Sequence, residues 1–289
     1  MKPVPFDYHV PGELGEALEM LAQLDNARPL AGGQSLVPML NLRVATPDHV
    51  IDLNRIEELR GVRIGQDRLR IGAMTTQRTL ERSDVIASFC PMLVQALEHI
   101  GHQQTRNRGT IGGSICHMDP GAELPVVASA LDATLCVASR RGRRFIGMKD
   151  FPAGYLTTQL EADELLVSIE MPKDTRRCGT AFVEFSRRPA DFAIVSVAAL
   201  VEIAPVGTIE RVAISIGGLD AVPTRLLEFE ETVLNHPMND EVVRGAMDAA
   251  RQTPAVDQGE YTAEYRSHVA ALLCERSFRH AWQRAVQGG

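Results

Sequence analysis

Two glycine-rich segments constrain this chain more than any other feature of its sequence. The first is Ala31-Gly32-Gly33-Gln34-Ser35-Leu36, and the second, about 75 residues later, is Gly109-Thr110-Ile111-Gly112-Gly113-Ser114. Each leads into an apolar segment, a setting in which successive backbone N–H groups can converge on anionic oxygens. A glycine pair can also mark a tight turn that needs a positive φ, and this explains either segment alone. Together, the two segments favour a clamp for a pyrophosphate.

The length and composition indicate a globular protein with more than one unit. The chain has 289 residues, of which 45% are hydrophobic and 23% are charged, enough for two or three subdomains with cores of their own. Because no apolar run approaches the roughly 18 residues of a membrane span and the N-terminus lacks a secretory signal, we expect a cytoplasmic protein without a membrane span. The net charge of −7 argues against a nucleic-acid partner.

The cysteines and histidines do not form a recognisable metal site. The five cysteines are widely spaced and include no C-x₂-C pair, and the eight histidines include no H-E-x-x-H. His99 and His102 stand three residues apart, but no third ligand is near them in the sequence, so we interpret them as a polar helix end. We therefore expect no iron–sulfur cluster and no zinc in this chain.

The first 55 residues predict a small βαβ-like unit. Apolar residues recur at the helical period over 14–24, and a short strand at 29–31 runs into the first glycine segment. A short helix over 36–42 would point its N-terminus back at the glycines, and a buried strand follows at 49–53.

The next 120 residues alternate strands and helices in a different pattern. A hairpin is expected at 62–65 and 69–72, and Asp119-Pro120 is interpreted as the N-cap and first residue of a helix over 121–131. The other expected elements are helices at 76–82 and 91–100 and strands at 133–138, 144–146 and 164–170.

After a boundary near residue 175, the pattern changes again. Three successive strands joined by turns predict an antiparallel meander, and the helices that follow could cover one of its faces. The strands are expected at 180–186, 193–203 and 211–217, and the helices at 226–234, 240–251 and 263–284. The fold class is therefore α+β.

Several motifs, in order along nearly the whole chain, resemble one known family. This is the FAD-binding medium subunit of molybdenum hydroxylases, the family of xanthine dehydrogenase and aerobic carbon monoxide dehydrogenase. The motifs lie at 31–40, 71–76 (Ile-Gly-Ala-Met-Thr-Thr), 106–114, 117–123 (His-Met-Asp-Pro-Gly-Ala-Glu), 187–195 and 264–266 (Glu-Tyr-Arg). The resemblance implies an FAD-binding domain of the vanillyl-alcohol-oxidase type over 1–175, with subdomains at about 1–55 and 56–175. A small α+β C-terminal domain with a three-stranded antiparallel sheet would follow over 176–289.

The resemblance also implies which residues hold FAD. Glu123 matches an acidic position that accepts from cofactor hydroxyls, although a carboxylate in the first turn of a helix would explain it as well. Ile100 and Leu166 fall where the family packs apolar side chains around the flavin ring, and plain core burial is the alternative. His117, Arg106 and Arg108 lie close enough in sequence to approach the cofactor, but the arginines could instead brace the loop. The full implied set is Leu30, Ala31, Gly32, Gly33, Gln34, Ser35, Leu36, Ile100, Thr110, Ile111, Gly112, Gly113, Ser114, His117, Glu123 and Leu166.

Two further positions bear on how this chain would hold FAD. The family often has a lysine shortly before the Arg187-Arg188 pair, whereas this chain has Val183-Glu184-Phe185, so we expect no cationic contact from that strand. Gln34 cannot form the histidyl–flavin bond of some flavoproteins, and we therefore expect non-covalent FAD.

The resemblance implies an electron relay. In similar systems a large molybdopterin-binding subunit oxidises the substrate, a small subunit carries electrons through [2Fe–2S] clusters, and FAD delivers them to an external acceptor. The assembly would be a heterotrimer or its dimer, and no side chain here need act as acid, base or nucleophile. Two rivals are a stand-alone FAD-dependent oxidoreductase, which would need a titratable pair near the flavin, and a partner protein that has lost its cofactor. The intact glycine segments argue against the latter.

Overall fold

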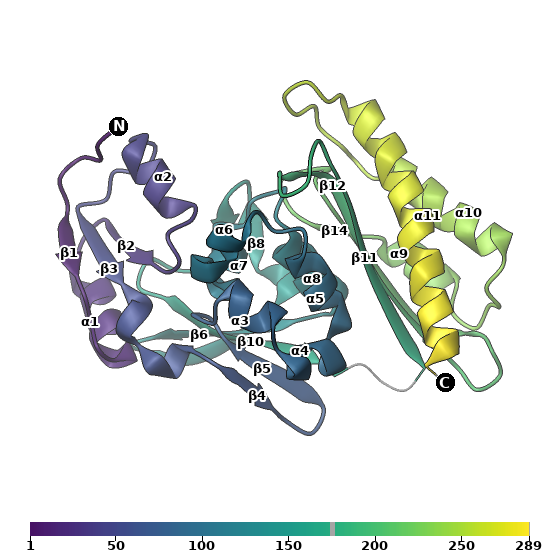
Figure 1. Ribbon diagram of the computed structural model, residues 1–289, viewed down its shortest axis with the longest axis horizontal. Coiled ribbons are helices and arrows are strands. Elements are labelled where there is room, and N and C mark those ends of the chain that lie inside the picture. The colour runs from purple at the N-terminus through teal and green to yellow at the C-terminus, as the bar shows by residue number, and fades with distance from the viewer. Residues whose placement is uncertain (174–176, 289) are drawn as a thin grey trace.

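The computed structural model describes residues 1–173 and 177–288, which form three adjoining parts (Figure 1). A small N-terminal sheet, a central sheet with several helices and a C-terminal sheet with a long helix follow one another along the chain. This mixture of helices and sheets confirms the α+β class. The expected boundary near residue 175 falls on residues 174–176, which lie outside the described residues.

The N-terminal part is a three-stranded parallel sheet in the order β1-β3-β2. The predicted strand–helix–strand unit is present, and the structure adds β1, a strand that the sequence did not indicate. The apolar face of α1 is buried, as its periodicity predicts. The elements are β1 (Asp7–His9), α1 (Leu14–Gln23), β2 (Ala27–Leu30), α2 (Leu36–Asn41) and β3 (His49–Asp52).

The central part is a five-stranded antiparallel sheet in the order β4-β5-β10-β6-β7. Its strands are β4 (Val62–Ile64), β5 (Arg68–Gly72), β6 (Thr134–Ser139), β7 (Gly142–Gly147) and β10 (Leu165–Pro172), and β8 (Pro152–Gly154) pairs separately with β9 (Thr157–Thr158). Its helices are α3 (Gln77–Glu81), α4 (Asp84–Phe89), α5 (Pro91–Leu97), α6 (Gln103–Arg108), α7 (Ile111–His117) and α8 (Glu123–Ala130).

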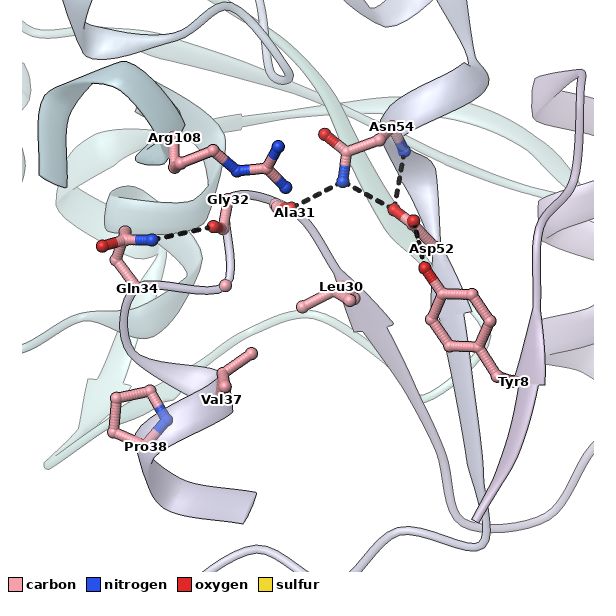
Figure 2. A pocket seen from close by; sticks show the side chains of 11 residues that line it. Tyr8, Leu30, Ala31, Gly32, Gln34, Val37, Pro38, Asp52, Asn54 and Arg108 are labelled. Atoms are coloured by element: carbon pink, nitrogen blue, oxygen red, sulfur yellow. Dashed lines mark hydrogen bonds between the residues drawn. The ribbon is translucent and has the colours of Figure 1, made fainter. Parts of the chain in front are cut away.

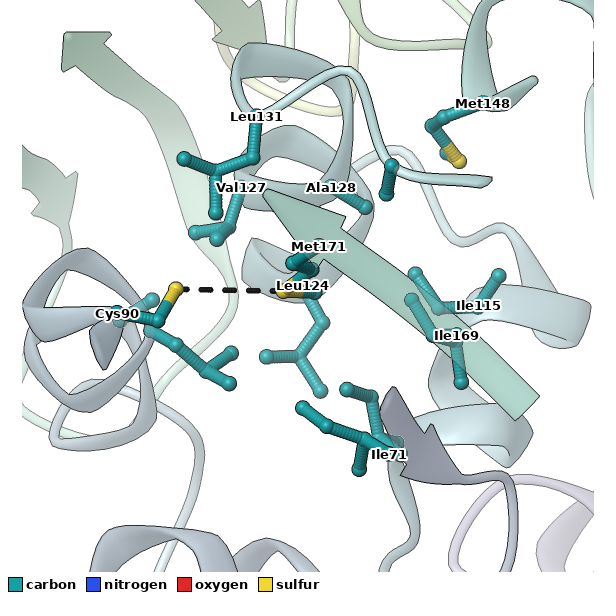
Figure 3. Close-up of a cluster of buried hydrophobic side chains, with 14 of the residues drawn as sticks. Ile71, Cys90, Ile115, Leu124, Val127, Ala128, Leu131, Met148, Ile169 and Met171 are labelled. Carbon is teal, nitrogen blue, oxygen red and sulfur yellow. Dashed lines mark hydrogen bonds between the residues drawn. The ribbon is translucent and has the colours of Figure 1, made fainter. Parts of the chain in front are cut away.

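Two apolar cores cover the two faces of this central sheet. On one face, Val167 and Ala138 pack with Leu18 of α1, which joins the N-terminal part to the central part. On the other face, Ile71 and Ile169 belong to a core with residues of α5, α7 and α8. Figure 3 shows the two isoleucines beside Ile115 of α7 and Leu124 of α8. The central sheet is therefore buried between two layers.

The C-terminal part is a four-stranded antiparallel sheet, β11-β12-β13-β14, between two helical layers. Successive residues of β11 alternate between the layers: Phe182 belongs to the core with α5 and α8, and Val183 to the core with α11. The elements are β11 (Cys178–Ser186), β12 (Ala193–Ile203), β13 (Ile209–Gly217), β14 (Thr224–Arg225), α9 (Leu227–Thr232), α10 (Asp240–Gln252) and α11 (Ala263–Gln287). Along the described chain, no helix is both long and apolar enough to cross a membrane.

Three local expectations differ from the structure. The second glycine segment is not an open loop, because Thr110 caps the helix α7 with a side-chain bond to the Gly113 amide. Asp119 does not cap α8: it accepts from the Gly121 amide, and the helix begins only at Glu123. The C-terminal sheet has a fourth, two-residue strand, β14, which is too short to leave a period in the sequence.

Candidate functional site

The first glycine segment connects the end of β2 to the start of α2, and both of its glycines are required by geometry. A Cβ on Gly32 would lie 2.2 Å from the carbonyl oxygen of Arg108, so any side chain would collide with backbone. Gly33 has a φ of +75°, a left-handed conformation that side chains disfavour. These glycines bring the turn into direct contact with the end of α6, which is distant in sequence.

The amide groups of this turn are available to a ligand. Among the described residues, no protein acceptor is bonded to the backbone N–H of Gly32, Gly33, Gln34 or Ser35. The carbonyls of the turn are used instead: Gly33 accepts from the Val37 amide at 3.1 Å. Successive unbonded amides in a tight turn form a concave site that suits an anion such as a diphosphate.

The second glycine segment is braced from within the protein. The Ile111 and Gly112 amides donate to the carbonyls of Thr75 and Ala73, at 3.1 and 2.9 Å. A Cβ on Gly112 would lie 2.6 Å from the Ala73 Cβ, so this glycine permits close packing. The amides of 111–114 are all bonded within the protein, and what the segment can offer a ligand is the backbone amide of Thr110 and the hydroxyl groups of Thr110 and Ser114.

A cavity of about 400 Å³ opens beside the first glycine segment (Figure 2). Its polar wall is a chain of hydrogen bonds: the Tyr8 hydroxyl donates to Asp52, and the Asn54 amide donates to Asp52 Oδ1 at 2.6 Å and to the Ala31 carbonyl at 2.9 Å. Partial burial opposes ionisation, but the bonds from Tyr8 and Asn54 and the charge of Arg108 together lower the pKa of Asp52. The cavity is lined by Tyr8, Leu30, Ala31, Gly32, Gly33, Gln34, Val37, Pro38, Asp52, Asn54 and Arg108.

The two arginines beside the second segment have different roles. The guanidinium of Arg106 bonds both oxygens of Glu81, at 3.1 and 3.0 Å, and the carbonyls of Ile100 and Gly101, both at 2.9 Å. Arg106 therefore braces the segment. Arg108 lines the cavity and is exposed, so its charge faces the open amides.

The remaining candidates lie on other elements of the central part: Ile100 follows α5, Leu166 is on β10, His117 ends α7 and Glu123 begins α8. Ile100 and Leu166 are both buried in the central core. His117 is partly buried, with Nε2 at 4.0 Å from Asp119 Oδ2. Glu123 is 6% exposed in the first turn of α8, and burial, followed by the charge of Glu184, raises its pKa to about 8.

Sequence reasoning missed the polar wall of the cavity and the significance of Glu184. Tyr8 meets Asp52 only because β1 pairs in parallel with β3, in a register that places each residue of β1 beside the residue 42 positions later. In the sequence, Glu184 was noted only as part of Val183-Glu184-Phe185, the stretch without the family's lysine. Its side chain is 1% exposed on β11, and burial raises its pKa to about 7, against a smaller lowering by the Ser186 hydroxyl.

Two family models match the chain, and together they span most of it. One, described as the FAD binding domain in molybdopterin dehydrogenase, matches residues 4–174. The other, described as the CO dehydrogenase flavoprotein C-terminal domain, matches residues 180–281.

Similar proteins match over nearly their whole length. The chain is 37% identical to the glyceraldehyde dehydrogenase medium chain of Sulfolobus acidocaldarius, over 96% of this chain and 99% of that one. Its structure resembles carbon monoxide dehydrogenase from Hydrogenophaga pseudoflava, with a TM-score of 0.95 and 36% identity over 98% of this chain and 99% of that chain. It also resembles quinoline 2-oxidoreductase from Pseudomonas putida 86, with a TM-score of 0.93 and 31% identity over 99% of each chain.

Proposed function

Because the chain belongs to the family of FAD-binding medium subunits of molybdenum hydroxylases, we propose that its glycine turn and cavity hold FAD for electron transfer within a larger complex. The observation that carries the proposal is the row of unbonded amides over 32–35, set beside Arg108. Bound FAD would supply the redox chemistry, taking electrons singly from [2Fe–2S] clusters of a partner and releasing them to an external acceptor.

The residues of this chain bind and orient the cofactor. The amides over 32–35 would bond the diphosphate oxygens, and Arg108 would offset part of their charge. The hydroxyls of Thr110 and Ser114 would add donors from the second segment, and Ile100 and Leu166 would contribute apolar surface near the ring. Ile111, Gly112 and Gly113 would act through packing, because their amides are bonded within the protein.

The proposed complex contains two further kinds of subunit. A large molybdopterin-binding subunit would oxidise the substrate, and a small [2Fe–2S] subunit would deliver the electrons, in a heterotrimer or its dimer. The names of the similar proteins support this, since one is the medium chain of a dehydrogenase and another is a carbon monoxide dehydrogenase described by its molybdenum cofactor. The external acceptor and the cytoplasmic placement stay predictions.

Purification tests the proposal through the cofactor itself. The chain is expected to bind one FAD, to turn yellow, and to release all of the flavin when it is denatured in acid, because Gln34 offers no group for a covalent flavin bond. Flavin that stays with the denatured chain would contradict the non-covalent assignment. A colourless chain that cannot be reconstituted with FAD would contradict the function, and full catalytic activity of the isolated chain would favour a stand-alone oxidoreductase.

A further inference from the structure

The cavity beside the first glycine segment has hydrogen-bond donors on one side and acceptors on the other (Figure 2). The donors are the unbonded amides over 32–35 and the guanidinium of Arg108, and they suit an anion. The other side is the polar wall formed by Tyr8 of β1, Asp52 at the end of β3 and Asn54. The diphosphate would occupy the donor side, which leaves the polar wall for a different part of the ligand.

The carboxylate of Asp52 can accept one more hydrogen bond. Its Oδ1 accepts from the Asn54 backbone amide at 2.9 Å and from Asn54 Nδ2 at 2.6 Å, so both lone pairs of this oxygen are used. Within the part of the chain that the structure describes, Oδ2 accepts from the Tyr8 hydroxyl alone. That hydroxyl gives its proton to Asp52, and Asn54 Nδ2 gives its second hydrogen to the Ala31 carbonyl. The wall therefore offers a ligand acceptors and no donor.

The protein itself holds the wall in place. The bond of 2.9 Å from Asn54 Nδ2 to the Ala31 carbonyl links the wall to the residue before Gly32. Arg60 holds Asn54 in turn, because its Nη2 donates to the Asn54 carbonyl at 2.9 Å. Partial burial opposes the ionisation of Asp52, but the bonds from Tyr8 and Asn54 lower its pKa overall, so the carboxylate is charged at neutral pH. A charged acceptor repels a phosphate and binds hydroxyl groups strongly.

Asp52 and the glycine turn lie at the same edge of the N-terminal parallel sheet. Strand β2 ends at Leu30, which stands beside Asp52 in the register, and the turn and α2 connect the two strands. Asp52 follows Gly32 by 20 residues. In βαβ units that bind dinucleotides, the pyrophosphate lies on the glycine turn, and an acidic residue about 20 residues later accepts from a ribose hydroxyl of adenosine. This chain has the same order of parts without the G-x-G-x-x-G spacing.

We propose that Asp52 accepts hydrogen bonds from the ribose hydroxyls of the adenosine half of FAD, so that the cavity holds this half and the flavin lies beyond the diphosphate. The inference rests on the proposed function. Tyr8 and Asn54 fill the other acceptor sites of the carboxylate and leave one for the ribose. Leu30, Val37 and Pro38 supply the apolar part of the cavity lining, against which the adenine base would pack.

Calorimetric titration of the full-length apo-protein with ADP and with 2′,3′-dideoxy-ADP tests the proposal, because the two nucleotides differ only in the ribose hydroxyls. In the native chain, the loss of both hydroxyls should weaken binding by roughly tenfold or more, as for other hydrogen bonds to a charged acceptor. In Asp52→Asn this ratio should fall to about threefold or less, since a neutral amide is a weaker acceptor. Asp48→Asn is the control and should keep the native ratio, because Asp48 is exposed and does not line the cavity.

Three results would overturn the proposal. The first is equal affinity of the native chain for the two nucleotides, a measurement that depends on no variant being folded. The second is failure of ADP to bind a chain that binds FAD. The third is an Asp52→Asn chain that loses affinity for FMN and keeps it for ADP, because the flavin half would then occupy the cavity. If FAD itself does not bind, the proposed function fails, whereas each of the three results leaves FAD binding intact and contradicts the role of Asp52 alone.

Discussion

Substitution of Gly32 by alanine is expected to lower FAD affinity by roughly a hundredfold or more. The new Cβ would lie 2.2 Å from the Arg108 carbonyl oxygen and 2.8 Å from the Gly109 Cα, and these backbone atoms cannot rotate away as a side chain could. The turn must therefore separate from the end of α6. Overpacking of this kind costs about 3 kcal/mol, which corresponds to a hundredfold change in a dissociation constant.

Fluorescence titration of apo-protein with FAD measures this effect. Gly15→Ala is the matched control, because a Cβ at that position in α1 meets nothing within 4 Å and alanine favours a helix. The control should bind FAD as the native chain does and be at least as stable. Native affinity in Gly32→Ala, with the fold intact by circular dichroism, would show that the contact between the two glycine segments is not needed for the cofactor.

Replacement of Arg106 by glutamine is expected to destabilise the protein by about 3 kcal/mol and to weaken FAD binding. The guanidinium is 12% exposed and holds Glu81 and two carbonyls at once, so its loss leaves a half-buried carboxylate without its main partner. The hydrogen bonds from Arg106, and to a smaller extent its charge, lower the pKa of Glu81 against the opposing effect of burial. Because α6 then loses its anchor, Arg108 and Gly109 would no longer be fixed beside the first glycine turn.

Urea denaturation and FAD titration together separate these effects. Arg106→Lys should not restore stability, since one ammonium group cannot reach the carboxylate and both carbonyls in the planar pattern of a guanidinium. Arg78→Gln is the control, because Arg78 also pairs with Glu81 but is 30% exposed and contributes less. Equal losses in Arg78→Gln and Arg106→Gln would contradict a bracing role specific to Arg106.

The elements that the sequence predicted are those with a local pattern. The burial of Leu18 and Leu21 in α1 follows from their helical spacing. The meander over β11–β13 follows from apolar strands that are separated by turn residues. Strand β1 escaped prediction because three residues leave no period, and it forms only by pairing with β3. The helix α7 escaped because two glycines disfavour helix, and its cap and the packing of Gly112 on Ala73 outweigh that preference.

The candidate site was predictable where a motif marks it and not where distant segments meet. The glycine pair of the first turn is a motif that can be recognised in the sequence itself. The amides of Ile111 and Gly112 are already bonded to the carbonyls of Thr75 and Ala73. Nothing in the spacing of residues along the sequence indicates these bonds. The same holds for the distinction between Arg106, which braces, and Arg108, which lines the cavity.

Anaerobic transfer of electrons into the FAD-loaded chain tests the central claim most directly. The large and small partner subunits are reduced, freed of excess reductant and mixed with the chain while flavin and iron–sulfur absorbance are followed. The account predicts that the flavin bleaches as the clusters are reoxidised, and that Gly32→Ala, mixed at an FAD concentration too low to fill its weakened site, leaves the clusters reduced. Flavin that stays oxidised beside reduced clusters, in a complex that has assembled, would contradict the account.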